Sequence, residues 1–337
     1  MSSRSIHILR PGLQTTVQDL GRWGHQALGV SVAGPMDPFS HRFANALVGN
    51  VRSAATLEIT VAGPDIEFEN ECFVAIAGAE FSVTVDGVAV PHTHPFIVAS
   101  RSRMYFGSRV RGARGYLAVH GGFDVPVVLG SRSTHVSTGT GGWRGRPLEK
   151  GDRLPIGVTL RPSLERVREH LRGEVVLGIR HQPDWTPKML RNPIKVGSHT
   201  PSVVRVFVGP DTDRFGAEAV KALHAAPYSI DAESDRMGFR LRGAQLHHVG
   251  GPDIISDPTP AGTVQVPGSG QPILLMADRQ TSGGYPRIAT VISADIGIAG
   301  QLAPGDQLLF RTCTEAEALT ALIARERALL AVEAAWS

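Results

Sequence analysis

The sequence has very little cysteine and no long apolar run. Its two cysteines, Cys72 and Cys313, lie far apart and match neither a metal-ligand nor a redox spacing. Because nothing in this pattern depends on disulfides, a reducing cytoplasm is the expected compartment. No apolar run approaches the roughly 18–20 residues that cross a bilayer, and the N-terminal residues lack the apolar stretch of a secretory signal. We therefore expect a cytoplasmic protein that does not cross a membrane.

Several common cofactor and catalytic motifs are also missing. The GSG at residues 268–270 lacks the Lys-Ser/Thr of a phosphate-binding loop, and there is no Rossmann fingerprint. The sequence has no HExxH, no paired CxxC and no Gly-x-Ser-x-Gly, and His247 and His248 form an isolated pair. No metal site is therefore predicted. The formal net charge of +3 is small and no basic run occurs, so nucleic acid is not an expected partner.

What the sequence does have is length and frequent turn residues. A chain of 337 residues favours two domains, and a 42% apolar content is that of an ordinary globular protein. The 38 glycines and 23 prolines leave many short β-type segments, which favours a mainly β fold of the sandwich or barrel kind. Examples are residues 73–76, 81–85, 96–98, 116–119, 203–208 and 273–276.

Helical patterns are few. We expect short helices over residues 40–48, 163–171 and 214–223. The longer pattern over residues 315–336 is rich in Ala and Leu with charges on one side, so this helix should pack on the outside of the protein.

A weak internal repeat relates the two halves. LEKGDRL at residues 148–154 matches LAPGDQL at residues 302–308, an offset of 154. Other landmarks follow in a similar order, and prolines cluster between residues 183 and 201. We therefore predict two related β-barrel-like domains, residues 1–200 with a connecting segment at about 160–200, and residues 201–337 with the C-terminal helix.

The most informative segment for function spans residues 262–295, in which two strand-like runs flank the polar sequence DRQTSGGYPR. The amides of Gln265 and Gln280 suit a lactam or ureido group. Asp278 and Asp295 are candidates for proton transfer if burial raises their pKa values, and Tyr285 supplies a phenol. The alternative is a polar hairpin loop whose glycines and proline only shape the turn.

Three further segments carry candidate polar groups. Gln18 and Asp19 precede a Gly-Arg turn that can expose both, although Asp19 can equally cap its own turn. Asp37 precedes a predicted helix, where N-capping would explain it. Asn45 lies inside that helix, an unfavoured position, so a neighbour is expected to need its amide. Arg236 can bind a carboxylate or phosphate, or can pair with Asp235 or Asp231.

The segment around residues 116–134 leaves its alternatives open. His120 precedes Gly-Gly and is either a base or a structural histidine. Arg132, Ser133 and Thr134 fit an anion-binding loop or an ordinary surface loop.

Taken in order, the motifs TTVQDLGR, GPMD, LEIT, YLAV, L..GD, QVP..G.PI and DRQT.GGYP resemble the biotin-dependent carboxyltransferase family, also named allophanate hydrolase subunit 2, over residues 6–310. The resemblance implies two cyclophilin-like β-barrel domains. Thr281-Ser282 stands where family sequences often have Thr-Thr, so a hydroxyl is kept. The resemblance places polar site candidates on Gln18, Asp19, Asp37, Asn45, Arg236, Gln265, Asp278, Gln280, Thr281, Tyr285 and Asp295.

The family includes the C-type subunit of an ATP-dependent 5-oxoprolinase, which acts with an A-type and a B-type subunit to convert 5-oxoproline to glutamate. The resemblance therefore implies this activity, with Asp278, Gln280, Tyr285 and Asp295 as catalytic candidates and the other positions binding the small-molecule substrate. The alternatives are a carboxyltransferase that moves a carboxyl group from carboxybiotin to urea or a related amide, and an antagonist of a kinase inhibitor related to the B-type subunit.

Cofactors are expected to reach the chain only through partners. None of its four lysines lies in a Met-Lys-Met biotinylation motif, so biotin would arrive on another protein. Without a nucleotide motif, ATP is expected to be used by the complex. These points favour the 5-oxoprolinase interpretation, with a chain that is not active alone.

Overall fold

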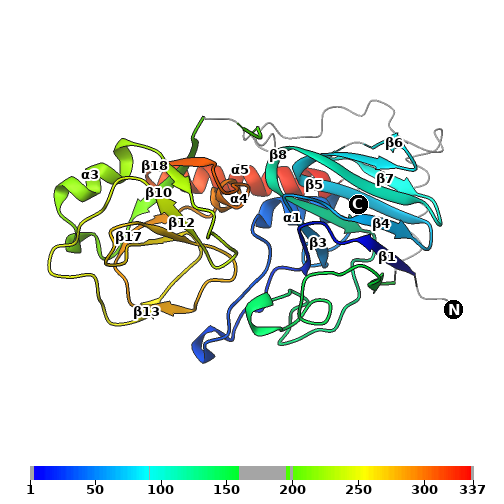
Figure 1. Ribbon diagram of the computed structural model, residues 1–337, viewed down its shortest axis with the longest axis horizontal. Coiled ribbons are helices and arrows are strands. Elements are labelled where there is room, and N and C mark those ends of the chain that lie inside the picture. Colours follow the sequence, from blue (N-terminus) through cyan, green and yellow to red (C-terminus); the bar gives the residue numbers. More distant parts are fainter. Residues whose placement is uncertain (1–3, 91, 159–194, 198–199, 335–337) are drawn as a thin grey trace. The chain divides into compact units, whose positions relative to one another are not determined.

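Short strands dominate the chain, as the spacing of its glycines and prolines predicts (Figure 1). The computed structural model describes residues 4–90, 92–158, 195–197 and 200–334, and the helix expected over 163–171 lies outside them. Unit 1 comprises Met1–Gly21, Pro38–Asn192 and Glu326–Ser337, and unit 2 comprises Arg22–Asp37 and Pro193–Arg325. The mainly β fold class is confirmed. The units differ from the two continuous halves of the prediction, because each combines separate stretches of the chain.

Unit 1 is built on a curled nine-stranded sheet with the path β2-β3-β8-β4-β1-β9, while β5 pairs with β6, β7 and β8. The segments expected at 73–76 and 81–85 belong to one long strand, β5, which shifts register against β8. Helix α1 (Pro38–Leu47) packs Phe39 and Phe43 against Phe73 and Tyr116 of these strands. The strands are β1 (Ser5–Arg10), β2 (Gln14–Gln18), β3 (Thr56–Thr60), β4 (Asp65–Phe68), β5 (Cys72–Val85), β6 (Val88–Ala89), β7 (Pro95–Val98), β8 (Arg103–Val119) and β9 (Arg153–Pro155).

Unit 2 contains a closed barrel in the order β10-β17-β14-β15-β12-β11-β18. A parallel pairing of β10 with β18 joins the start of the barrel to its end, and a small sheet of β13 and β16 lies off it. The elements are β10 (Ser202–Val208), α3 (Ala217–Ala225), β11 (Tyr228–Ile230), β12 (Gly238–Arg242), β13 (Asp257–Pro258), β14 (Thr263–Gln265), β15 (Ile273–Leu275), β16 (Ser282–Gly283), β17 (Arg287–Val291), α4 (Ile296–Gly300) and β18 (Gln307–Thr312). Short 3-10 turns are η1 (Gln26–Leu28), η2 (Val136–Thr138) and η4 (Thr212–Arg214).

Helix α5 (Glu315–Glu333) confirms the long C-terminal helical pattern. Its last turns belong to unit 1, where Leu329 and Val332 are buried in the same cluster as α1. Glu326 binds both Arg42, at 2.7 Å, and Arg52, at 2.9 Å. Arg52 also binds Glu333. Because these charges join a buried apolar contact, the end of the helix is fixed to α1 by packing as well as by ion pairs.

The internal repeat corresponds to two turns with the same hydrogen bonds. Gly151 and Gly305 have φ of +95° and +90°, a conformation that favours glycine. In each turn the following aspartate, Asp152 or Asp306, accepts the backbone N–H three residues before it at 2.8 Å. In each turn, the glycine N–H donates to the carbonyl of an isoleucine, and the isoleucine N–H donates to the carbonyl of the aspartate. This isoleucine is Ile8 in unit 1 and Ile230 in unit 2. This agreement supports the duplication that the sequence repeat indicates.

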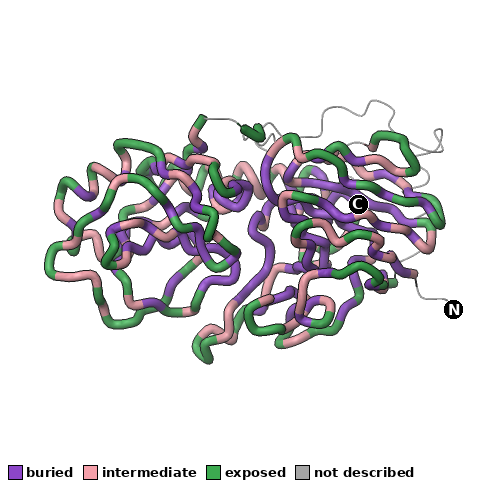
Figure 2. The backbone as a smooth tube through the Cα atoms, in the orientation of Figure 1, coloured by how far each residue is buried: buried purple, intermediate pink, exposed green. Residues whose placement is uncertain are grey.

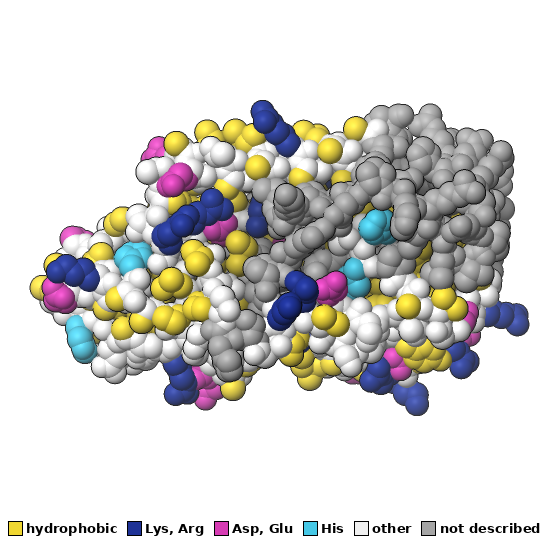
Figure 3. All heavy atoms as spheres, turned by 90° about the horizontal axis from the view of Figure 1, so that it is seen from above, with side chains coloured by type: hydrophobic (Ala, Val, Ile, Leu, Met, Phe, Trp, Pro, Cys, Tyr) yellow, Lys and Arg dark blue, Asp and Glu magenta, His cyan; other side chains and the backbone are white. Residues whose placement is uncertain are grey.

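Buried residues follow the strands of each unit, whereas loops are largely exposed (Figure 2). On the face in Figure 3, cationic and anionic side chains of the described residues are interspersed. None of the helices in the described part of the chain combines the length and apolarity that a membrane span requires.

Candidate functional site

The polar segment singled out in the sequence forms the loop between β15 and β17 of unit 2. Thr259 holds it from the neighbouring segment, because its N–H donates to the carbonyl of Thr281 at 3.1 Å and its hydroxyl donates to the carbonyl of Gln280 at 2.7 Å. The pairing of β13 with β16 extends this contact. The loop is therefore fixed by main-chain bonds, which leaves its side chains available for other contacts.

Two amides converge over Gly283. A Cβ placed on Gly283 would lie 2.5 Å from the Nε2 atoms of both Gln265 and Gln280. A side chain at this position would have to displace both amide groups, so the absence of a Cβ on Gly283 allows them to approach each other. Gln265 is buried and donates one N–H to the carbonyl of Tyr285 at 3.3 Å, and Gln280 is exposed. Since each amide has two N–H donors, the pair retains donors directed at one small region.

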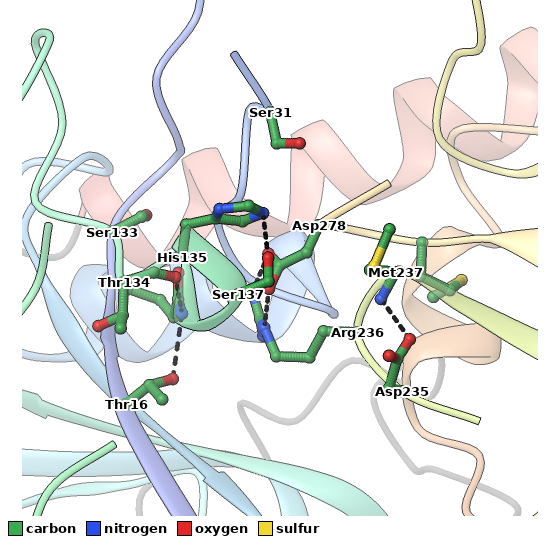
Figure 4. Close-up of polar contacts among 12 residues, drawn as sticks. Thr16, Ser31, Ser133, Thr134, His135, Ser137, Asp235, Arg236, Met237 and Asp278 are labelled. Carbon is green, nitrogen blue, oxygen red and sulfur yellow. Dashed lines mark hydrogen bonds and ion pairs between the residues drawn. The ribbon is translucent and has the colours of Figure 1, made fainter. Parts of the chain in front are cut away.

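Asp278 begins this loop and is bound by Arg236. The guanidinium donates through Nε and Nη2 to the two carboxylate oxygens, each at 2.9 Å (Figure 4). Nη2 also donates to the carbonyl of Gly34 at 2.6 Å. Both side chains are 6% exposed. The backbone N–H of Asp278 donates to the carbonyl of Arg236. A bidentate pair of this kind positions both groups and the chain around them.

The partners that the sequence suggested for Arg236 are wrong. Asp231 forms an ion pair with Arg242. The carboxylate of Asp235 instead accepts the backbone N–H of Met237 at 2.8 Å, as Figure 4 shows. Both acids are close to Arg236 in sequence, but the local turn and the β11–β12 pairing use them for other contacts.

Two other carboxylates of unit 2 are engaged away from the loop. Asp295 is 1% exposed and accepts from Nε and Nη2 of Arg205 at 2.9 and 2.7 Å. Asp37 accepts a hydrogen bond from Nε2 of Gln301 at 2.9 Å. These contacts attach residues 22–37 and the start of α4 to the rest of unit 2.

Asp19 organises a loop in unit 1. Its carboxylate accepts from the hydroxyls of Ser131 and Ser133, the backbone N–H of Arg132 at 2.5 Å and that of Gly21 at 2.9 Å. Burial raises the pKa of Asp19, but these hydrogen bonds outweigh it and hold the pKa below its ordinary value. The bond to Gly21 confirms that Asp19 caps its own turn, and the loop that resembled an anion site supplies donors to this internal anion.

Gln18 and Asn45 are also buried in unit 1. Nε2 of Gln18 donates to the hydroxyl of Thr16 at 3.0 Å and to the carbonyl of Thr134 at 3.1 Å. Its buried Oε1 has no partner among the residues that the structure describes. The amide of Asn45 donates to the carbonyl of Ala54 at 2.8 Å and accepts from Asn50, so it ties α1 to the loop that follows.

Burial lowers the pKa values of two histidines in this unit, His41 and His120. His41 contacts the hydroxyl of Thr56 at 2.9 Å, and burial lowers its pKa to about 4. His120 contacts the carbonyl of Val48 at 2.7 Å, and burial lowers its pKa as well. The geometry of His120 favours the structural interpretation that the sequence left open.

The structure therefore gathers part of the predicted set. Among the predicted residues, those on or beside the polar loop of unit 2 are Arg236, Gln265, Asp278, Gln280, Thr281 and Tyr285. Asp37 and Asp295 have partners elsewhere in that unit, and Gln18, Asp19 and Asn45 belong to unit 1. Sequence reasoning missed Arg279, which is buried within the same loop. Its signal was present, since Arg279 follows Asp278 in the DRQT motif.

Unit 2 has a closed barrel and a polar loop lined by amides, and unit 1 is a second β unit with an equivalent Gly-Asp turn. These features define a duplicated, mainly β class of protein. The chain belongs to the family of the carboxyltransferase domain, subdomain A and B, whose model matches residues 28–312. The resemblance stated from the motifs is thereby confirmed. In the described residues no group of three or more His, Cys, Asp or Glu side chains is placed to hold a metal ion.

Relatives in this family have two kinds of name. The chain is 38% identical over 316 residues to the 5-oxoprolinase C subunit of Escherichia coli (strain K12), covering 94% of each protein. It is 32% identical to the 5-oxoprolinase C subunit of Haemophilus influenzae, covering 93% of each. The crystal structure of Kluyveromyces lactis urea carboxylase is 29% identical, with a TM-score of 0.86 over 99% of this chain and 29% of that larger protein.

Proposed function

We propose that this chain is the C-type subunit of a multi-subunit 5-oxoprolinase and contributes the binding of the cyclic amide. The observation that carries the proposal is the convergence of Gln265 and Gln280 over Gly283, in a chain that matches two proteins named as C subunits of 5-oxoprolinase along nearly its whole length. A lactam presents a C=O beside an N–H, and amide side chains complement both.

In this proposal the two amides donate hydrogen bonds to the lactam carbonyl. Opening the ring places negative charge on that oxygen, so donors that are already positioned stabilise the transition state more than the substrate. Tyr285 is 39% exposed beside them and closes the edge of the site. Asp278 supports the loop through Arg236, and Asp295 supports α4 through Arg205.

The described residues of this chain do not form a glycine-rich phosphate loop of the kind that holds ATP. Phosphate groups are held by a glycine-rich loop with a following lysine, whereas Lys221 is exposed on α3 and pairs with Glu218 at 2.9 Å. Lys150 lies in the exposed turn beside Gly151. We therefore assign no ATP-dependent step to this chain and propose that A-type and B-type partner subunits supply it.

The experiment is reconstitution with those partners, measuring glutamate formed from 5-oxoproline and the ATP consumed. Gln265→Leu and Gln280→Leu should each lower kcat/KM about 10- to 100-fold, the loss expected when one hydrogen bond to the transition state is removed. Gln307→Leu, in strand β18, is the matched control and should keep the wild-type value. A wild-type complex that leaves 5-oxoproline intact, or amide variants as active as the control, would sink the proposal.

A second function is favoured by the match to urea carboxylase, which extends over 99% of this chain. Under that alternative the amides bind a ureido group, and a partner protein delivers carboxybiotin. The same reconstitution with urea and carboxybiotin in place of 5-oxoproline distinguishes the two, because each function predicts turnover in one assay and none in the other.

A further inference from the structure

Arg279 is a buried cation whose charge no acid in the described structure balances. The side chain is 9% exposed. Its Nε donates to the carbonyl of Thr259 at 2.8 Å, and Nη1 approaches the carbonyl of Met276 at 3.4 Å. Burial lowers the pKa of Arg279, and no neighbouring carboxylate opposes that effect. An unpaired buried charge is costly, so its retention in a binding loop requires a reason.

Three other arginines of unit 2 are each bound to acids. Arg236 pairs with Asp278, Arg205 with Asp295, and Arg287 with both Asp211 and Asp257. Their charges are therefore compensated within unit 2. Arg279 differs from these three arginines because its two partners are neutral carbonyls.

The geometry of Arg279 leaves donors for a ligand. A guanidinium has five N–H donors, of which the two carbonyls use two. The Nη2 group has no hydrogen-bond partner among the described residues, and it is not fully buried. The main chain of Arg279 is also fixed, because its carbonyl accepts from the hydroxyl of Ser31 at 3.0 Å. A fixed guanidinium with a free edge suits a planar carboxylate.

We propose that Arg279 binds the carboxylate of the ligand, so that it selects a charged substrate while the amides of Gln265 and Gln280 bind the uncharged amide. This inference rests on the proposed function and deepens it. 5-Oxoproline carries a carboxylate on its lactam ring, and carboxybiotin carries one on its ureido nitrogen. A single uncompensated positive charge matches either monoanion better than a phosphate group.

The test compares ligand pairs that differ only in the carboxylate, using the reconstituted complex and equilibrium binding. One pair is 5-oxoproline and 2-pyrrolidinone, and the other is carboxybiotin and biotin. In the wild type, the charged member of one pair should bind about 10- to 100-fold more tightly, as expected for hydrogen bonds between ionised groups. Arg279→Gln should abolish this preference and leave the affinity for the uncharged member unchanged.

Two further variants make the result specific. Arg279→Lys keeps the charge without the two-pronged donor edge and should give an intermediate preference. Arg240→Gln removes an exposed arginine of the same unit, which lies 3.8 Å from Glu233, and should leave the preference intact. Thermal unfolding of each variant detects any loss of folded protein.

The outcomes are separable from those of the proposed function. A preference in the carboxybiotin pair alone supports the anion site while contradicting 5-oxoproline as substrate. The anion site is overturned if the wild type shows no preference in either pair, or if the preference survives Arg279→Gln. Where a variant does not fold, a wild type without a preference in either pair still overturns the anion site.

Discussion

Gly283→Ala is the sharpest perturbation of the proposed site, because it adds one methyl group where two amides meet. The new Cβ would stand 2.5 Å from the Nε2 atoms of Gln265 and Gln280, so both must retreat by roughly 1 Å to reach an ordinary contact. A displacement of that size in a positioned group costs about 100-fold in rate. We expect kcat/KM for 5-oxoproline in the reconstituted complex to fall by about that factor.

The neighbouring glycine provides the control. A Cβ on Gly284 would have the carbonyl of Ile254 at 3.3 Å and the hydroxyl of Ser256 at 3.6 Å as its nearest neighbours, which small adjustments can accommodate. Gly284→Ala should therefore change kcat/KM less than about threefold. Because the groups displaced in Gly283→Ala are the ends of flexible side chains, its unfolding free energy should fall by no more than about 1 kcal/mol. Equal activity in the two variants, or activity lost in proportion to stability, would refute the reasoning.

Two further predictions concern ion pairs. Asp278→Ala removes the acid that binds the buried Arg236 at two atoms and should lower the free energy of unfolding by about 3–5 kcal/mol. Combining Asp278→Leu with Arg236→Met should recover most of this loss. Urea denaturation measures both variants, and a loss under about 1 kcal/mol in Asp278→Ala would contradict the prediction. For Asp152, burial raises the pKa, but Arg146 and the Glu149 N–H lower it to about 2. Because the folded-state pKa of Asp152 is depressed, the stabilisation by its ionised form is present above about pH 4 and is lost as the pH falls toward 2. After solvent screening is allowed for, Asp152→Asn should remove about 1 kcal/mol of this acid dependence of the unfolding free energy. An unchanged pH profile of unfolding would refute this prediction.

Local patterns predicted local structure well. The β-branched runs flanking the DRQT loop form β15 and β17, and the amphipathic patterns at residues 40–48 and 214–223 form α1 and α3 within a few residues. The Gly-Asp repeat corresponds to two equivalent turns. These features depend on neighbouring residues, and so composition and spacing are informative about them.

Long-range pairing was harder to predict. The barrel closes through β10 and β18, which are about a hundred residues apart, and Arg236 binds an acid 42 residues away in place of Asp231 or Asp235. Gln265 and Gln280 approach each other over Gly283, a third residue that has no side chain. The sequence places Arg279 beside Asp278, but it does not show that this aspartate binds Arg236 and leaves Arg279 without an acid among the described residues.

The interleaving of the two units has a consequence for how the protein is made. Residues 22–37 are synthesised early but belong to unit 2, whose remaining residues begin at 193. Unit 1 includes residues from 326 onward, among them Leu329 and Val332, which pack with α1. Neither unit can complete its core as a continuous stretch leaving the ribosome, so folding finishes only when the last helix is available. Cutting the chain near residue 200 would deprive both units of part of their own structure. A protein made as two fragments should be active only if residues 22–37 are moved to the fragment of unit 2 and residues from 326 onward to the fragment of unit 1.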